Sequence, residues 1–266
     1  MKSNWIYIVW FLFYFILFSV LTFGLAIPFY LVLVPFAFSR HAESLWRRVS
    51  GVRPLRLRME KERLLPLFRE VYEGAVDSAP YLSKKIRLYI KEDMSINAFA
   101  FGESTLVLTR GSVQLLSDEC LKGLMAHEFG HFAHGDTTAN LFATVSNLFL
   151  SLTMKLLSDI RSKYEDKEKI GILQSGFKAL FDLLYYVFRI PQIIGDLFLM
   201  RHSRKHEYFA DCFAFDSGFG KELTEVLLEI YQISVEKPKS VKEQMNSSHP
   251  HITLRIELLE SEGYSP

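Results

Sequence analysis

This chain of 266 residues has few cysteines and almost no net charge. Its two cysteines, Cys120 and Cys212, are too few for a disulfide framework and favour a reducing, cytosol-facing compartment. We interpret both as small buried residues. The 31 basic and 30 acidic residues leave a formal net charge of +1, so no general basic field favours binding to nucleic acid. The length allows one or two domains with an ample core.

Charged residues are missing altogether from two long segments. Residues 3–39 form an uncharged run of 37 residues rich in Phe, Leu, Ile and Val, which predicts insertion into a membrane. As one helix the run would extend about 55 Å, against about 30 Å of hydrocarbon core. Two short spans near Trp5–Leu21 and Leu25–Phe38 therefore fit, and so does one long tilted helix. The second run, 137–154, is uncharged for 18 residues, just enough to span.

The residues that flank these runs predict an orientation. Arginines follow the first run, and by the positive-inside rule that flank is cytoplasmic. Phe177–Met200 is apolar but carries Asp182, Arg189 and Asp196 at intervals of seven, on nearly one helical face. Together with 137–154 it predicts either a second membrane hairpin or an amphipathic cover over a site, and between two and four spans in total. The arginines of the first flank are Arg40, Arg47, Arg48, Arg53, Arg56 and Arg58.

The best-defined motif reads A-H-E-F-G-H-F-A-H from residue 126 onwards. His127 and His131 are four apart, so on a helix they share one face, where two imidazoles can bind one Zn²⁺. Glu128 between them can act as a general base toward a water molecule. The local sequence predicts that helix, with Ser117 as its N-cap and Gly135 as its C-terminal stop.

Hydrophobic periodicity predicts a small sheet directly before this helix. The order β-α-β-β-β-α is typical of an antiparallel or mixed sheet with one covering helix. The predicted strands are Pro54–Met59, Lys85–Ile90, Ser95–Gly102 and Thr105–Thr109, and the predicted helix is Glu60–Val76.

A catalytic zinc ion needs a third protein ligand, which the motif does not supply. His134 does not fit the metzincin pattern, and we interpret it as a surface or capping residue. Glu207 and Asp211 are four apart and share a helical face, which suits a ligand and a carboxylate that orients a zinc-bound imidazole. An ordinary solvated helix face with nearby basic residues explains the same spacing. His206 points to another face and is not expected to be a ligand.

Two further polar residues lie near the C-terminus. His249 can hydrogen-bond a developing oxyanion, and Arg255 can hold its loop or the acidic residues near the metal. A surface loop that enters a C-terminal helix accounts for both residues equally well.

Taken together, these pieces resemble the HtpX-like membrane zinc endopeptidases, relatives of the CAAX prenyl protease. The matching segments occur in the family's order and cover nearly the whole chain. They are the N-terminal apolar run, N-A-F-A-F-G, T-R-G, H-E-F-G-H, two apolar helices, S-R-K-H-E-Y-F-A-D and H-P-H-I-T-L-R-I. The resemblance implies an α+β, mainly helical zincin-like (gluzincin) fold with a small sheet and N-terminal transmembrane helices.

The resemblance also implies a role for each site residue. One Zn²⁺ per chain would be bound by His127, His131 and Glu207, with Glu128 as the catalytic base. Asp211 would orient a ligand, His249 would donate a hydrogen bond to the transition state, and Arg255 would support it. An edge strand would bind peptide substrate by β-augmentation. Its residues would be Asn97, Ala98, Phe99 and Ala100.

The expected activity is hydrolysis of polypeptides, in particular membrane or misfolded proteins, by an integral protein of a prokaryotic-type inner membrane. The catalytic domain would face the cytoplasm. The expected divisions are a membrane segment (1–40), the sheet with the His-Glu helix (41–136), two membrane-associated helices (137–200) and the second half of the catalytic domain (201–266).

Two other functions are compatible with parts of the pattern. A non-catalytic, zinc-stabilised membrane scaffold would bind the same ion, but it has no need of Glu128. An intramembrane protease of the site-2 type would carry its His-Glu motif inside an apolar span, whereas Asp118, Glu119 and Lys122 precede the motif here.

Overall fold

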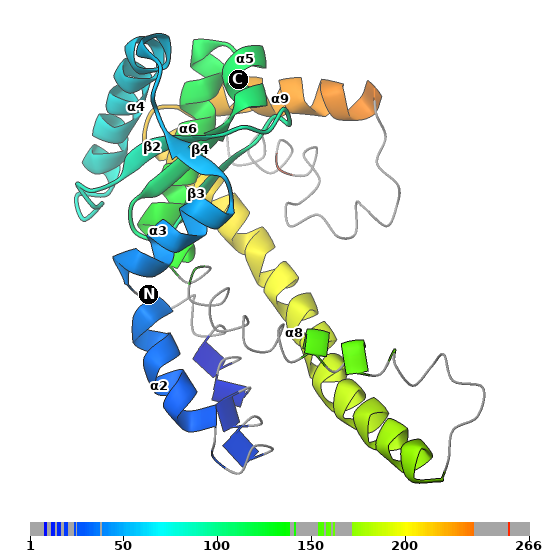
Figure 1. Cartoon of the computed structure of the whole chain (residues 1–266). Helices are drawn as coiled ribbons and strands as arrows, with labels where there is room; N and C mark the ends of the chain where they lie inside the picture. The colour runs from blue at the N-terminus through cyan, green and yellow to red at the C-terminus, as the bar shows by residue number, and fades with distance from the viewer. Residues whose placement is uncertain are drawn as a thin grey trace. The chain divides into compact units, whose positions relative to one another are not determined.

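The computed structural model describes two long stretches, residues 39–138 and 172–236 (Figure 1). It also describes 8–9, 12–13, 15–16, 19–20, 24, 26–37, 141, 154–156, 158–160, 162 and 255. The chain forms two compact units: Met1–Asn4 with Phe38–Leu141 and His202–Pro266, and Trp5–Ala37 with Phe142–Arg201. The first unit contains the His-Glu motif and also Glu207.

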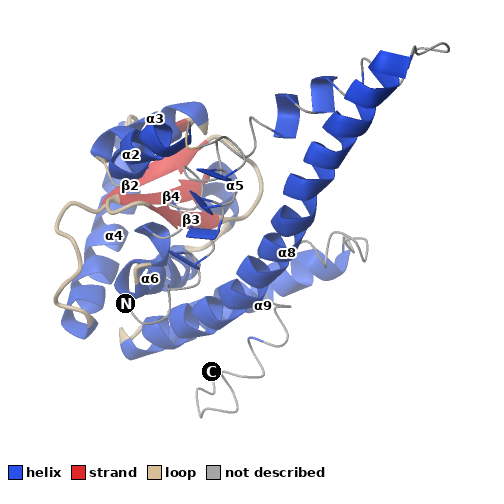
Figure 2. Ribbon diagram, turned by 90° about the horizontal axis from the view of Figure 1, so that it is seen from below, coloured by secondary structure: helices blue, strands red, loops and turns tan. Residues whose placement is uncertain are grey.

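A four-stranded mixed sheet lies in the first unit, with the order β1-β2-β4-β3. Figure 2 shows β2, β4 and β3 side by side. β2 and β4 run parallel, while β1 and β3 pair antiparallel to their neighbours. Every residue of β4 is buried, as expected for a central strand, and β3 forms one edge. The strands are β1 (Val52–Pro54), β2 (Arg87–Lys91), β3 (Ala98–Phe101) and β4 (Thr105–Thr109).

The predicted mixed sheet is confirmed, but the first strand was predicted too far along the chain. The strand ends at Pro54, and Arg58 already belongs to α4 (Arg58–Ser78). The reason is local: the Glu60 carboxylate accepts hydrogen bonds from the backbone N–H groups of Arg56 and Leu57, each 3.2 Å long. This cap starts the helix before the alternating pattern is complete.

The helix with the His-Glu motif is α6 (Asp118–His134), and both of its predicted ends are confirmed. The Ser117 hydroxyl accepts a hydrogen bond from the Cys120 N–H at 3.1 Å. Gly135 has a φ of +82° and caps the carbonyls of the last turn. Leu121, Met125 and Phe129 are fully buried on the face that packs against α4 and the sheet.

Two glycines on α6 permit close helix crossings. A Cβ atom at Gly123 would lie 2.3 Å from the backbone of Glu222 in α9 (Gly220–Glu236). A Cβ atom at Gly130 would lie 2.6 Å from the Cα of Ala210 in α8 (Ile172–Asp216). The two glycines are seven residues apart, so they lie on one side of α6 two turns apart. That side receives the hairpin formed by the end of α8 and α9.

A short amphipathic helix, α3 (Arg40–Val49), covers the other side of the sheet from α4 and α6 (Figure 2). Its buried Glu43 accepts hydrogen bonds from Arg47 at 3.1 Å and from Ser104 at 2.8 Å, and it also bonds Thr105. A carboxylate is costly to bury unless it is hydrogen-bonded in this way. The cluster therefore attaches α3 to the start of β4.

The second unit contains α2 (Ala26–Ala37) and α8 as far as Arg201. α8 runs without interruption through the predicted Phe177–Met200 helix and on to Asp216, so the expected division between 200 and 201 falls inside it. Among the described residues, no helix is both long enough and apolar enough to cross a membrane. The predicted span at 137–154 lies largely outside the described residues, and the one at 3–39 lies partly outside them.

Candidate metal centre

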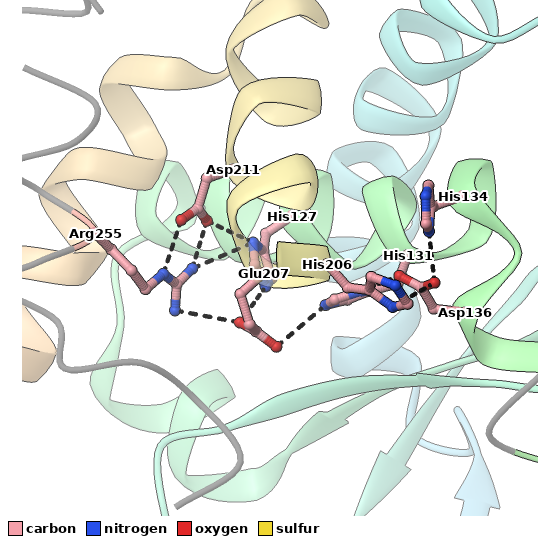
Figure 3. Close-up of polar contacts among 8 residues, drawn as sticks. All are labelled: His127, His131, His134, Asp136, His206, Glu207, Asp211 and Arg255. Atoms are coloured by element: carbon pink, nitrogen blue, oxygen red, sulfur yellow. Dashed lines mark hydrogen bonds and ion pairs between the residues drawn. The ribbon is translucent and has the colours of Figure 1, made fainter. Parts of the chain in front are cut away.

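Two imidazoles and one carboxylate converge where α6 and α8 cross (Figure 3). His127 and His131 lie one turn apart on α6, with ring centroids 4.9 Å apart and ring planes at 88°. Glu207 on α8 reaches both rings. Its Oε2 lies 3.4 Å from His127 Nε2, and its Oε1 lies 3.6 Å from His131 Nε2. His127 and Glu207 are buried.

These separations fit a zinc site. Ligand atoms at about 2.0 to 2.1 Å from a tetrahedral zinc ion are about 3.3 to 3.4 Å from one another. The oxygen-to-nitrogen distances of 3.4 and 3.6 Å match that value within a few tenths of an ångström. Two imidazole nitrogens and a carboxylate oxygen are also a donor set that zinc prefers. The residues present therefore fit the ion that the motif predicts.

Glu128 lies beside the two histidines. Its side chain is buried, and its carboxylate lies within 4.8 Å of ligand nitrogens of both His127 and His131. Because it follows His127 directly on the helix, it is rotated away from the face that Glu207 meets. This leaves its carboxylate available to a water molecule next to the ligands.

A buried ion pair supports the first histidine. Asp211 Oδ1 lies 2.8 Å from His127 Nδ1, and Arg255 Nε donates to Asp211 Oδ2 at 2.8 Å. Asp211 is fully buried and Arg255 nearly so. The predicted orienting residues are thus brought together beside the Nδ1 atom of His127. Arg255 Nη1 also lies 3.6 Å from Glu207 Oε2, so it contacts both acidic residues.

The charges in this cluster shift its pKa values strongly. Burial and the Arg255 charge lower the pKa of His127, but Asp211 and Glu207 outweigh them and raise it to about 9. Burial raises the pKa of Asp211, but the Arg255 and His127 charges prevail and hold it below its usual value. Asp211 therefore stays ionised as the partner of both groups.

The second histidine has a carboxylate of its own, Asp136. Asp136 Oδ2 lies 3.1 Å from His131 Nδ1, and its Oδ1 lies 2.6 Å from His134 Nδ1 and 2.8 Å from His206 Nδ1. Burial raises the pKa of Asp136, but hydrogen bonds to the three imidazoles outweigh this and hold its pKa well below its usual range. His134, expected at the surface or as a cap, belongs to this cluster instead.

The predicted substrate strand lies at the edge of the sheet. β3 covers Ala98–Phe101, and Asn97 precedes it. The backbone N–H of Asn97 donates to the Ser112 hydroxyl at 2.8 Å, and its carbonyl accepts from the same hydroxyl at 2.7 Å. Trp46 of α3 stacks on Phe101 and meets Phe99 edge-on. Hydrogen bonds to Ser112 thus fix the start of the strand, and Trp46 covers the face that carries Phe99 and Phe101.

Comparison with known proteins identifies the family. A model of peptidase family M48 matches residues 67–263, well over half of the chain. The chain belongs to peptidase family M48. This confirms the resemblance to HtpX-like proteases that the motifs predict. It also agrees with the observed architecture of this M48 chain, which is mainly helical with one small sheet.

Curated relatives of this M48 chain are named "Protease HtpX homolog". The one from Bacillus pumilus is 25% identical over 199 residues, which are 68% of this chain and 64% of the relative. The one from Bacillus subtilis is 24% identical over 250 residues, 85% of this chain and 80% of the relative. The match thus spans slightly less than two thirds of the Bacillus pumilus protein.

Among solved structures, the chain is similar to Ste24p of S. mikatae. The TM-score is 0.52 with 18% identity, over 89% of this chain and 57% of that one. At this identity the likeness concerns the fold alone, and it agrees with a mainly helical M48 architecture.

The described residues of this M48 chain contain most of the predicted site. His127, Glu128, His131, Glu207, Asp211 and Arg255 come together, whereas His249 lies outside the described residues. Sequence reasoning missed Asp136 and the part played by His206. One signal was present: an acidic residue directly after the glycine that ends the His-Glu helix, where the chain turns back toward that helix.

Proposed function

We propose that this M48 chain is a zinc-dependent endopeptidase. The observation that carries the proposal is the position of Glu207, with one oxygen 3.4 Å from His127 Nε2 and the other 3.6 Å from His131 Nε2. Each distance is close to the value of about 3.3 Å expected between two ligand atoms of one tetrahedral zinc ion. The proposed ligands are therefore His127, His131 and Glu207, with one Zn²⁺ per chain.

When bound, zinc supplies Lewis-acid chemistry and makes a coordinated water easier to deprotonate. Glu128 accepts the proton as water attacks the peptide carbonyl, and then delivers it to the amine nitrogen that leaves. Asp211, held by Arg255, keeps His127 turned with Nε2 toward the ligand set. By the family resemblance, His249 donates a hydrogen bond to the oxygen that becomes negative.

We propose that the substrate is a polypeptide bound in extended form along β3. An edge strand offers unpaired backbone groups to a further strand, and the side chains of a bound peptide then alternate between the two faces. Ala98 and Ala100 point away from the face that Trp46 covers, since residues two apart share a side. Ala98 is buried in the core, so a bound peptide would pair with the backbone edge of the strand and not with this face.

The protein is proposed to be an integral membrane protein with its catalytic unit in the cytoplasm. The support is the uncharged run 3–39 and the arginines that follow it. Membrane or misfolded proteins in a prokaryotic-type inner membrane are then the substrates within reach, and lipid is its permanent surrounding. The divisions 1–40, 41–136, 137–200 and 201–266 remain our proposal for the sequence order of membrane and catalytic parts.

Replacement of Glu128 by Gln tests the activity. Purified full-length protein loaded with zinc is assayed for cleavage of casein and of a membrane-protein substrate, and its zinc content is measured. Glu128→Gln should retain zinc but lose at least about 100-fold in cleavage rate, the contribution typical of a general base. Glu225→Gln, at an exposed position on α9, is the matched control and should cleave normally.

Two other results would contradict parts of this proposal. A Glu128→Gln variant that retains zinc and cleaves as fast as the wild type contradicts the assignment of the base. Stoichiometric zinc in a wild type that cleaves no member of a broad peptide panel contradicts the peptidase proposal and supports the non-catalytic scaffold.

A further inference from the structure

Asp136 lies at the centre of three imidazoles from two helices (Figure 3). The residue directly follows the Gly135 cap of α6, and its side chain is almost fully buried, at 3% exposure. One oxygen is within 3.1 Å of His131 Nδ1. The other accepts from His134 and from His206, at 2.6 and 2.8 Å. A single buried carboxylate is thus engaged through both of its oxygens.

The chemistry of these contacts fixes a tautomer. An ionised carboxylate can only accept hydrogen bonds, so each facing Nδ1 must carry a proton. For His131 this leaves Nε2 as the unprotonated nitrogen, and Nε2 is the atom that faces Glu207. A metal ligand requires that form of the ring, held in that orientation by a bond to its other nitrogen. Asp136 thus holds the Nδ1 atom of His131, just as Asp211 holds the Nδ1 atom of His127.

The third contact reaches across to α8. His206 directly precedes Glu207, so the carboxylate that orients one proposed ligand also holds the neighbour of another. His134 packs between α6 and α8, with its ring 4.6 Å from His206 and 4.6 Å from Phe209. These contacts lie at the C-terminal end of α6, where Gly135 ends the helix.

His134, Asp136 and His206 also form a group that could hold a cation, but their spacing is that of hydrogen bonds. The group's nitrogen-to-oxygen distances of 2.6 and 2.8 Å are those of hydrogen bonds. Ligands that share one zinc ion are about 3.3 Å apart. The geometry is that of a carboxylate that collects N–H donors.

We propose that Asp136 is a positioning residue of the zinc site, which orients His131 directly and Glu207 through His206. The inference rests on the proposed function, because it assigns a task toward the same ion. Its prediction concerns zinc affinity, which can be measured without any peptidase assay.

The test compares Asp136→Asn and Asp136→Ala with the wild type by chelator competition for zinc on the full-length protein. Loss of a carboxylate that orients a ligand typically costs about 10- to 100-fold in metal affinity. We expect a loss in that range for Asp136→Ala, and a smaller loss for the nearly isosteric Asp136→Asn, whose amide keeps one acceptor oxygen. Asp216→Asn, at an exposed position on α8, is the control and should bind zinc normally.

A second readout separates positioning from a purely structural role. With Co²⁺ in place of zinc, the visible absorption bands report ligand geometry, and Asp136→Asn should shift them while Asp216→Asn should not. His206→Ala should weaken zinc binding less than Asp136→Ala does. The loss of zinc affinity in the double variant Asp136→Ala/His206→Ala should be smaller than the product of the two single losses, because both residues act through one contact.

The outcomes distinguish this proposal from the previous one. If both Asp136 variants bind zinc within twofold of the wild type and leave the Co²⁺ spectrum unchanged, the positioning role is wrong, whatever the protein cleaves. If the variants lose affinity as expected but the wild type cleaves nothing, the positioning role stands and the peptidase proposal fails. A wild type that binds no zinc contradicts both.

Discussion

The close approach of α8 to α6 makes a sharp prediction about Gly130. Alanine there would place a Cβ atom 2.6 Å from the Cα of Ala210 and 3.0 Å from its Cβ. Ordinary carbon contacts begin at about 3.5 Å, so α8 must move by roughly 0.9 Å if the Cβ is to fit. Ala210 is flanked on α8 by Glu207 and Asp211, and both would move with it.

The expected effects on stability and on zinc binding differ in size. Overpacking costs about 1 to 3 kcal/mol, and alanine recovers about 0.5 to 1 kcal/mol in a helix interior. The net loss should be about 1 kcal/mol, a fall in Tm of roughly 2 to 4 °C for a chain of this size. Metal sites tolerate displacements of only about 0.5 Å, so zinc affinity should fall at least about tenfold.

The assay is thermal unfolding of the detergent-purified protein with and without zinc, together with chelator competition. Gly176→Ala is the matched control, since Gly176 is a glycine inside another helix, α8, where a Cβ would meet nothing within 4 Å. It should leave zinc affinity unchanged and raise stability by about 0.5 kcal/mol or more. A Gly130→Ala variant that binds zinc within twofold of the wild type would falsify the view that this crossing sets the position of Glu207.

Three further predictions follow from other contacts. Arg255→Ala should destabilise the protein by about 3 to 5 kcal/mol, because it leaves the buried Asp211 without its cation; a loss under 1 kcal/mol in denaturant unfolding contradicts this. Hydrogen bonding to Arg53 holds the pKa of Glu60 down at about 2, against 4.5 for the free group. Its stabilisation is therefore fully present above about pH 4.5 and is lost as pH falls toward 2. Glu60→Gln should flatten the fall of Tm over that range, whereas curves parallel to the wild type's would refute the link. Ser117→Ala should lower the free energy of unfolding by about 1 kcal/mol, because the N-cap of α6 is lost. An unchanged Tm would contradict this.

Local rules were sufficient for the parts of the site that lie within one helix. Spacing alone puts His127 and His131 on one face, and Ser117 and Gly135 mark both ends of that helix as the structure has them. The strand at Thr105–Thr109 was predicted with its bounds, because it is a short apolar run between threonines and a turn with a glycine precedes it.

Contacts between distant segments were beyond local rules. Spacing left Glu207 open between a ligand and a solvated surface residue, and only the family resemblance favoured the ligand. Asp136 could not be assigned, because its partners His131 and His206 meet only after α8 folds back onto α6. Nor does periodicity reveal that Gly130 is a crossing point, since an isolated glycine inside a helix usually signals only weaker helix propensity.

The two glycines of α6 also limit which sequences this site can tolerate. Gly123 and Gly130 touch no proposed ligand atom, yet the backbones of α9 and α8 lie where any side chain at these positions would project. In a saturation library scored by zinc-dependent cleavage, both positions should therefore tolerate few substitutions. A substitution at a ligand fails because the metal-binding group is lost. A substitution at either glycine fails because the added side chain has no space, so even alanine should be depleted at both positions.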